Sequence, residues 1–311
     1  MCGVVMTKFK LQTVIVVVAL IALIGQVQAS TRMIETANGP IKIEGDVQRV
    51  ITLDETALDV ALSVGVQPIG TLATRGGTDV APYLQAHLQG EIVLLGSPRE
   101  PNLEAILRLR PDLILVPATF SEVFYQKLSK IAPTIQPQGS VISTDWQSIS
   151  RTYAAALNKT AALEEKLSLI DQQLVAYRKR VIAPLHISIV RWNPQGPMVM
   201  SSKLFAGQIL KQAGLSSITL AYEVERTPHS DTLSLENMVQ ADGDWLLLAT
   251  LNEEGDKTLE QAKQQPAFQR LSVVRNNRVL AVDGQVWSSG SGPLAANIVL
   301  NDLKRIQINA E

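Results

Sequence analysis

A strand-free stretch near the middle of the chain, residues 146–183, sets the strongest limit on the fold. Its apolar residues recur at alternating intervals of four and three: Leu163, Leu167, Ile170, Leu174, Tyr177 and Val181. This spacing places them on one face of an α-helix. Thr160 suits the N-cap of that helix, and Pro184 suits its end. A coiled coil is the alternative, but three heptads inside a globular chain favour a long helix that bridges two lobes.

Short apolar runs alternate with helical stretches on both sides of this helix. The runs span residues 49–53, 68–73, 92–96, 112–116, 133–136, 186–192, 197–201, 244–249 and 278–283. Such alternation indicates parallel sheets, and near-continuous apolar strands indicate sheets covered on both faces. We therefore predict an α/β protein with two Rossmann-like lobes that contain parallel-type central sheets. The lobes are expected at residues 30–145 and 184–311, joined by a single long α-helix within 146–183.

The N-terminus has the pattern of a secretory signal. Lys8 and Lys10 precede an apolar run over residues 14–24, and small residues follow at Ala29 and Ser30. This order is typical of a signal peptide, and the run is shorter than the roughly 20 residues that span a bilayer. A tilted membrane anchor is the alternative. We predict that residues 1–29 are removed near Ala29 and that the mature protein is soluble and periplasmic. The one cysteine, Cys2, lies upstream of the run, so no disulfide is expected.

The residues that most enzymes need do not form a constellation in this sequence. The three histidines, His87, His186 and His229, lie in separate segments without metal-ligand spacing. There is no phosphate-binding glycine loop, and the motif at 289–292 lacks the order of a nucleophile elbow. The net charge of −1 argues against a nucleic-acid-binding surface. We predict a monomeric binding protein that is not an enzyme and has no catalytic residues, metal ligands or cofactor.

Two segments repeat one pattern, "PNLEAILRLRPDLILV" at 101–116 and "SLENMVQADGDWLLLA" at 234–249. Ungapped alignment pairs Glu104 with Glu236, each in the first turn of an expected helix, and Asp112 with Asp244. A single glutamate there is explained by the helix dipole, which it stabilises by about 0.3–1 kcal/mol. Its recurrence in both halves indicates equivalent elements, one in each lobe.

The first of these segments, with the preceding Glu100, resembles the signature of periplasmic iron–siderophore and cobalamin binding proteins. These are ABC-importer receptors whose lobes are joined by one long helix, the class III periplasmic binding proteins. "QRVITLDETALDVALSVGVQPIG" and "KLFAGQILKQAGL" are similar to the family's N- and C-lobe elements, whereas Gly243 stands where proline is common. Within the family, the chain most resembles the ferric dicitrate and ferric hydroxamate receptors. The resemblance implies that a ferric siderophore is captured and passed to a permease dimer in the inner membrane.

The resemblance also implies a role for the paired glutamates. In this family one glutamate on each lobe docks into an arginine pocket of the permease, and the matching positions are Glu104 and Glu236. Carboxylate and guanidinium groups can form bidentate, charge-assisted pairs, which suit a contact that forms and releases.

Ligand-binding residues are expected just after the strands, because ligands of open parallel sheets bind outside the carboxyl ends. The cationic and aromatic residues in such positions are Arg75, Arg99, Phe120, Tyr125, Arg191, Trp192, Tyr222, Arg226 and Trp287. Together they would offer charge and flat apolar surface to a ferric chelate. The resemblance supports Arg191 and Trp287, whereas Arg99 is one position later than the family's arginine.

Other ligands of the same family stay open from the sequence. Scarce histidine disfavours a bare zinc or manganese receptor, and the small arginine set disfavours a tris-catecholate. Haem remains an alternative because a tyrosine such as Tyr125 or Tyr222 could ligate its iron, and cobalamin is another. A periplasmic enzyme on this scaffold is the alternative from a different class.

Overall fold

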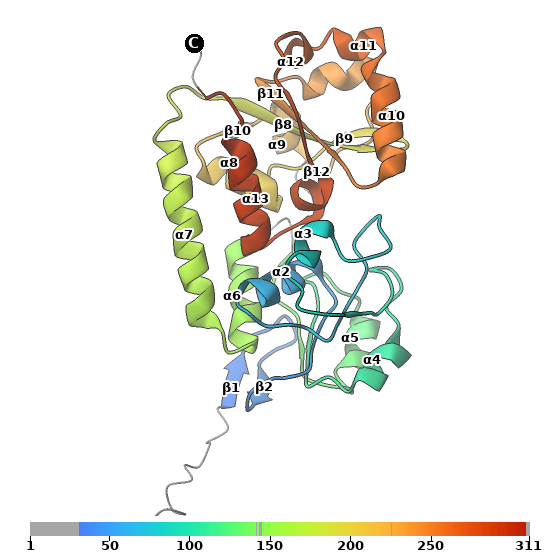
Figure 1. Cartoon of the computed structure of the whole chain (residues 1–311), viewed down its shortest axis with the longest axis vertical. Helices are drawn as coiled ribbons and strands as arrows, with labels where there is room; N and C mark the ends of the chain where they lie inside the picture. Colours follow the sequence, from blue (N-terminus) through green and yellow to red (C-terminus); the bar gives the residue numbers. More distant parts are fainter. Residues whose placement is uncertain (1–30, 141, 143–144, 225, 309–311) are drawn as a thin grey trace, which may run out of the picture.

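The computed structural model describes residues 31–308, except 141, 143–144 and 225, so the expected signal peptide lies outside the described residues. Two lobes are stacked along the long axis of the molecule, each built around one sheet (Figure 1). Among the described residues, no helix combines the length and apolar character that crossing a membrane requires.

The N-terminal lobe contains a parallel five-stranded sheet. Its strands are β3 (Val50–Thr52), β4 (Gly70–Thr71), β5 (Val93–Leu94), β6 (Leu113–Leu115) and β7 (Thr134–Ile135), in the order β5-β4-β3-β6-β7. The central strands β3 and β6 are fully buried, as their apolar runs predict. The helices of this lobe are α2 (Glu55–Ser63), α3 (Pro82–Gln85), α4 (Leu103–Leu109) and α5 (Glu122–Leu128). A hairpin of β1 (Thr31–Ile34) and β2 (Ile41–Glu44) precedes them.

The C-terminal lobe departs from the predicted parallel sheet at one strand. Strands β10 (Ser216–Ser217), β8 (His186–Asn193), β11 (Trp245–Thr250) and β12 (Val279–Asp283) are parallel in that order. The expected strand at 197–201 is β9 (Gly196–Val199), which pairs antiparallel with β8. Two residues separate β8 from β9, too few for the crossover that a parallel pair needs. Gly196, with φ of +123°, starts the returning strand.

Several short helices complete this lobe. They are α8 (Phe205–Gln212), α9 (Thr219–Glu223), α10 (Glu253–Lys263), α11 (Pro266–Gln269), α12 (Ser272–Arg275), the π-helical turn η2 (Gln285–Ser289) and α13 (Pro293–Leu303). The second glutamate segment forms a 3₁₀-helix, η1 (Glu236–Ala241), and not an α-helix like α4. The two glutamate segments therefore occupy corresponding positions but form different types of helix.

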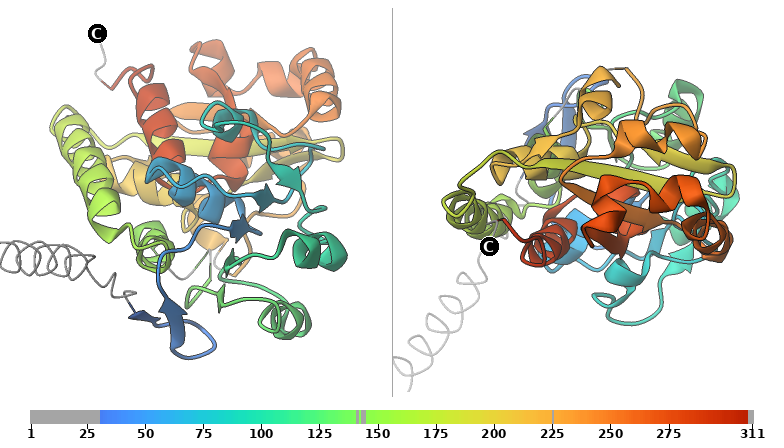
Figure 2. Two further views of the ribbon diagram at one scale, coloured as in Figure 1. Left: turned by 60° about the horizontal axis from the view of Figure 1, so that its bottom comes forward. Right: turned by 90° about the horizontal axis from the view of Figure 1, so that it is seen from above.

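The connection between the lobes consists of two helices. Helix α6 (Trp146–Ala156) comes first, and α7 (Thr160–Arg178) is the long helix that runs along one side of both lobes (Figures 1 and 2). The predicted stripe is buried from Leu163 to Tyr177. Two details of the prediction are wrong: Thr160 is the first helical residue and not the cap, and the helix ends six residues before Pro184.

One apolar core continues through both lobes. Trp146 of α6 meets Phe205 of α8 edge to face, with ring centroids 5.4 Å apart. The hydroxyl of Tyr177 on α7 donates to the carbonyl oxygen of Leu303 on α13. The lobes therefore pack against each other through buried contacts, in addition to their connection through α6 and α7.

A buried carboxylate ties α2 to α13, the helix that follows the last strand of the C-terminal sheet. The Asp59 oxygens accept hydrogen bonds from the backbone N–H groups of Leu294 and Ala295, both at 2.9 Å. A side chain at Gly292 would collide with this carboxylate, since its Cβ would overlap Oδ1 of Asp59. Burial raises the pKa of Asp59 to about 8, although the two hydrogen bonds oppose the rise.

We expect Asp59→Ala to destabilise the protein, because it leaves two N–H groups without an acceptor. Each buried unsatisfied group costs about 1–3 kcal/mol, so the free energy of unfolding measured by urea denaturation should fall by roughly 2–6 kcal/mol. The folded-state pKa of Asp59 lies above its ordinary value. Its contribution to stability is therefore lost progressively as the pH rises from about 4 to about 8, and the difference between wild type and variant should shrink over this range and level off above pH 8.

The exposed Asp231 provides the control. Asp231→Ala should change the free energy of unfolding by less than about 0.5 kcal/mol. Equal stability of the Asp59→Ala variant and the wild type at pH 6 would contradict the assigned tie between the helices.

Candidate ligand-binding site

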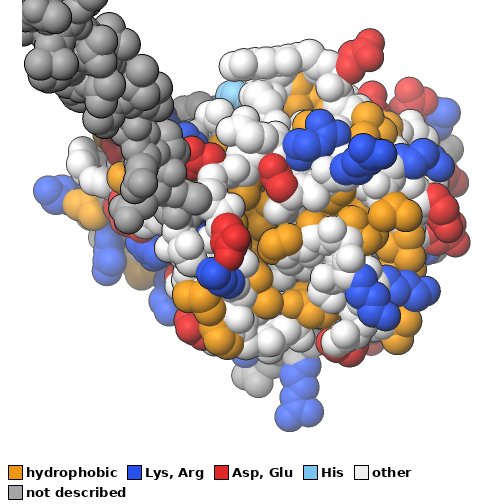
Figure 3. Space-filling view, turned by 90° about the horizontal axis from the view of Figure 1, so that it is seen from below, with side chains coloured by type: hydrophobic (Ala, Val, Ile, Leu, Met, Phe, Trp, Pro, Cys, Tyr) orange, Lys and Arg blue, Asp and Glu red, His pale blue; other side chains and the backbone are white. Residues whose placement is uncertain are grey.

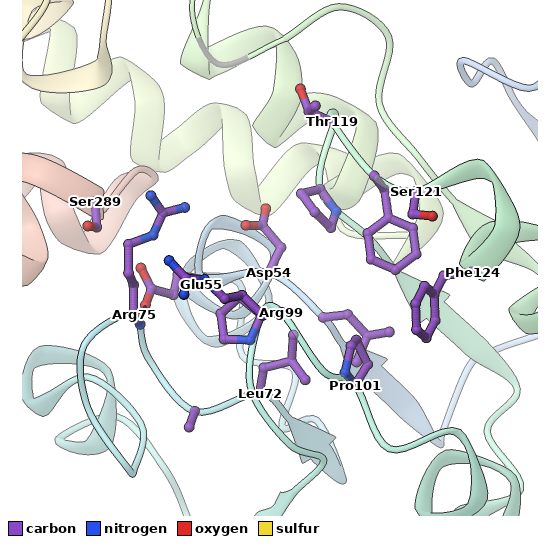
Figure 4. Close-up of a pocket in the computed structure, with 15 residues that line it drawn as sticks. Asp54, Glu55, Leu72, Arg75, Arg99, Pro101, Thr119, Ser121, Phe124 and Ser289 are labelled. Carbon is purple, nitrogen blue, oxygen red and sulfur yellow. Dashed lines mark hydrogen bonds between the residues drawn. The ribbon is translucent and has the colours of Figure 1, made fainter. Parts of the chain in front are cut away.

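A cavity of about 450 Å³ opens at the carboxyl ends of the N-terminal strands, as the rule for open parallel sheets predicts (Figure 4). Its wall comes from the segments that follow β3, β4, β5 and β6, with Ser289 of η2 added from the other lobe. The lining residues are Leu53, Asp54, Glu55, Leu72, Ala73, Arg75, Pro98, Arg99, Pro101, Pro117, Thr119, Phe120, Ser121, Phe124 and Ser289.

Two arginines supply positive charge to this cavity. Arg75 follows β4 and Arg99 follows β5, and both are exposed (Figure 4). Neither guanidinium makes a hydrogen bond or ion pair with any described residue. The nearby Glu55 carboxylate accepts bonds from the Thr74 hydroxyl and from the backbone N–H of Arg75. Glu55 therefore fixes the backbone of the Arg75 loop and leaves the guanidinium available to a ligand.

Two phenylalanines form an apolar part of the wall. Phe120 and Phe124 are half-buried, with ring centroids 6.4 Å apart and planes inclined at 60°. The ammonium group of Lys127 lies 5.7 Å from the Phe124 ring centroid, within cation–π range. Flat apolar surface beside two free guanidinium groups suits a ligand with both apolar faces and anionic oxygens.

Asp54 brings a carboxylate into the same cavity. Its Oδ2 accepts a hydrogen bond from the buried hydroxyl of Tyr153 on α6, at 3.0 Å. Burial raises the pKa of Asp54 to about 6, with the Tyr153 hydrogen bond acting in the opposite direction. None of the described basic side chains forms an ion pair with it.

Arg191, at the end of β8, approaches the site from the C-terminal lobe without lining the cavity. It is 6% exposed, and its Nε is buried without a hydrogen-bond partner among the described residues. Burial lowers the pKa of Arg191, and repulsion from Arg75 of the N-terminal lobe lowers it further. The Ser289 hydroxyl of the same lobe is also buried without a described partner.

Five of the predicted ligand-binding side chains lie away from the cavity. Tyr125 is buried in the N-terminal core, with its hydroxyl on the Thr134 carbonyl oxygen. Trp192 packs against Phe268, because neighbours in a strand face opposite sides and Arg191 takes the side toward the cleft.

The remaining three lie in the C-terminal lobe. Trp287 is buried and donates from Nε1 to Asp302 at 2.9 Å. The hydroxyl of Tyr222 accepts from the Ser217 N–H, and Arg226 is exposed in the next loop. The structure thus brings Arg75, Arg99 and Phe120 together. Neither Tyr125 nor Tyr222 lines the cavity, so neither is placed to ligate the iron of a haem bound there.

Sequence reasoning missed several lining residues. Asp54 and Glu55 directly follow the first strand of the sheet, so the rule that found Arg75 applied to them equally. The residues predicted from that rule were arginines and aromatic residues and did not include these two carboxylates. Phe124 lies on α5, four residues after Phe120, which precedes the helix. Ser289 carried no signal, since its approach depends on how the lobes meet.

The two glutamates occupy equivalent places in the two lobes. Glu104 lies in the first turn of α4, where Asn102 accepts the Ala105 N–H, and Glu236 begins η1, where Ser234 accepts the Asn237 N–H. Both are exposed, and neither carboxylate has a hydrogen-bond or ion-pair partner among the described residues.

The equivalence continues along both segments. Asp112 accepts the backbone N–H groups of Gln48 and Arg49, just before β3, and Asp244 accepts that of His186 at the start of β8. Each aspartate therefore holds the beginning of its lobe's neighbouring strand.

Seen from the end of the N-terminal lobe, the surface mixes apolar, basic and acidic side chains (Figure 3).

Comparisons with known proteins agree with this architecture. The chain is 27% identical over 288 residues to the Fe(3+)-citrate-binding protein YfmC of Bacillus subtilis, covering 89% of this chain and 86% of the relative. It is 26% identical over 287 residues to the probable siderophore-binding lipoprotein YfiY of B. subtilis, covering 89% and 87%. It is 23% identical to the Fe(3+) dicitrate-binding periplasmic protein FecB of Escherichia coli, covering 88% and 89%.

The fold is shared with solved structures. Staphylococcus aureus SirA, complexed with staphyloferrin B, superposes with a TM-score of 0.77 at 25% identity, covering 90% of this chain and all of that one. The periplasmic binding protein family model matches residues 50–286, which include the central sheets of both lobes, α7 and every lining residue of the cavity except Ser289. This chain therefore belongs to the periplasmic binding protein family.

Proposed function

We propose that the protein captures a ferric siderophore of the citrate or hydroxamate type between its lobes and delivers it to an ABC importer. The observation that carries this proposal is the cavity in which Arg75 and Arg99 lie without ion-pair partners beside Phe120 and Phe124. The names of YfmC, FecB and YfiY support a ferric chelate as the ligand class.

The donor set supports a complete chelate over a bare metal ion. Among the described residues there is no group of three or more histidine, cysteine, aspartate or glutamate side chains placed to hold a metal. A chelate brings its own coordination shell, so the protein has to recognise only the rim of the complex. Guanidinium groups recognise anionic rim oxygens, and aromatic rings pack on the apolar parts.

We further propose that the ligand is delivered to a permease dimer through Glu104 and Glu236. Each glutamate is followed three residues later by an exposed apolar side chain, Leu107 at 59% and Val239 at 65% exposure. Two equivalent surfaces, one on each lobe, match a partner that presents the same cationic and apolar contact twice, as a two-fold dimer does. The N-terminal pattern of residues 8–30 supports export to the periplasm.

Calorimetric titration tests the ligand class. We expect micromolar or tighter binding of at least one iron chelate from a panel of ferric citrate, ferrioxamine, ferrichrome and a ferric catecholate, with haem, cobalamin and zinc as alternatives. Binding of none of the iron chelates would contradict the proposal. Catalytic turnover of a chelate, in place of stoichiometric binding, would favour the enzyme alternative.

A further inference from the structure

Asp54 is the one carboxylate of the cavity whose role the proposed function does not explain. It lies at the carboxyl end of β3 and points into the space between Arg75, Arg99 and Thr119 (Figure 4). A negative charge there opposes the binding of an anionic chelate. The hydrogen-bond contacts of the Asp54 carboxylate indicate how this charge can be neutralised.

The contacts of Tyr153 leave room for one more proton. Its hydroxyl oxygen lies 2.8 Å from the carbonyl oxygen of Val116 and 3.0 Å from Oδ2 of Asp54. One hydroxyl carries one hydrogen and cannot donate fully to both acceptors. A proton on Asp54 resolves the conflict, since Asp54 then donates to Tyr153 and Tyr153 donates to Val116.

We propose that Asp54 takes up one proton when the cavity binds an anionic, carboxylate-rimmed ferric chelate, so that the chelate meets a neutral hydrogen-bonded acid. The proton comes from the solvent and adds to a carboxylate oxygen, and no bond of the chelate is broken. This inference rests on the proposed function and narrows its ligand to the citrate type.

The charged groups around Asp54 set the direction of the effect. Glu55 on α2, and the phenol groups of Tyr153 on α6 and Tyr83 on α3, surround it on the protein side, while Arg75 and Arg99 share the cavity. In the free protein the pKa of Asp54 is about 6, and a bound anion raises it further by repulsion. Above pH 6 binding therefore takes up a proton, and affinity falls as the pH rises.

The test compares the wild type with Asp54→Asn, using ferric citrate at pH 6.5 and 7.5. When binding takes up one proton, the affinity of the wild type falls by up to about tenfold for each unit that the pH rises. Calorimetry in buffers of different ionisation enthalpy should report the uptake of close to one proton. Asp54→Asn keeps the size of the side chain without the titration, so both its proton uptake and its extra pH dependence should disappear. Because both proteins bind the same chelate, the protonation of citrate itself cancels in this comparison.

Glu55→Gln is the matched control, since its carboxylate is adjacent in sequence and is already held by Thr74 and Arg75. This variant should change affinity but retain the proton uptake. Equal uptake by the wild type and Asp54→Asn would overturn the inference, as would proton release on binding. If ferric citrate fails to bind while another iron chelate of the panel binds, the inference falls and the proposed function stands. If none binds, both fall.

Discussion

Replacing Arg75 and Arg99 by alanine should nearly abolish binding of the ferric chelate without changing the fold. A hydrogen bond to a charged group contributes about 1.5–3 kcal/mol, so each substitution should weaken binding by roughly 10- to 100-fold. Both side chains are exposed and make no hydrogen bond with the described residues. The free energy of unfolding should therefore stay within about 0.5 kcal/mol of wild type. Calorimetric titration with the preferred chelate, together with urea denaturation, measures both quantities.

Two further variants sharpen this result. Arg270→Ala removes an exposed arginine whose Nε contacts only the Pro266 carbonyl oxygen, and it should bind like the wild type. Arg75→Lys retains the positive charge but not the planar guanidinium group. This variant should therefore bind the chelate more tightly than Arg75→Ala and less tightly than the wild type. Unchanged affinity in the double alanine variant would show that the cavity is not the binding site.

The double variant Glu104→Ala with Glu236→Ala should separate binding from transport. Both carboxylates are exposed, at α4 and η1, and neither lines the cavity. Chelate affinity should therefore stay unchanged, while uptake of radioactive iron chelate by cells that express the variant should fall to background. Each single variant should give an intermediate rate, because one of the two contacts remains.

The apolar neighbours provide an independent check. Leu107→Ser with Val239→Ser should also reduce uptake, whereas Val123→Ser on α5 should not, although Val123 is as exposed as Val239. Normal uptake by the double glutamate variant would rule out these residues as the docking contacts. Weakened chelate binding would instead point to a structural defect.

Patterns that depend on local periodicity were predictable from the sequence. The stripe from Leu163 to Tyr177 identified α7, and the buried runs identified β3 and β6, because burial of one face imposes a period on the residues. The position of Arg75 and Arg99 followed from the topology of parallel strands. Helix α6 was missed, since the stretch 146–183 was expected to contain only the long helix that starts near Thr160.

Side-chain direction was less predictable. Trp192 follows Arg191 directly, and only the pleat of β8 decides which of them faces the cleft. Tyr125 directly follows Phe124 on α5, yet it faces the core of the lobe. The partial burial of Asp54 and the full burial of Asp59 also depend on α6 and α13, elements that lie far away in sequence.

The core shared by α6, α7, α8 and α13 has a kinetic consequence. Since the lobes are already in contact through buried groups such as Asp59 and Tyr177, little rearrangement has to precede capture. We expect the association rate to be set by diffusion and charge steering, and to decrease as salt screens Arg75 and Arg99. Discrimination among chelates then resides in how long each one stays. Under the proposed delivery to a permease, contacts with both lobes would supply the work that opens the site.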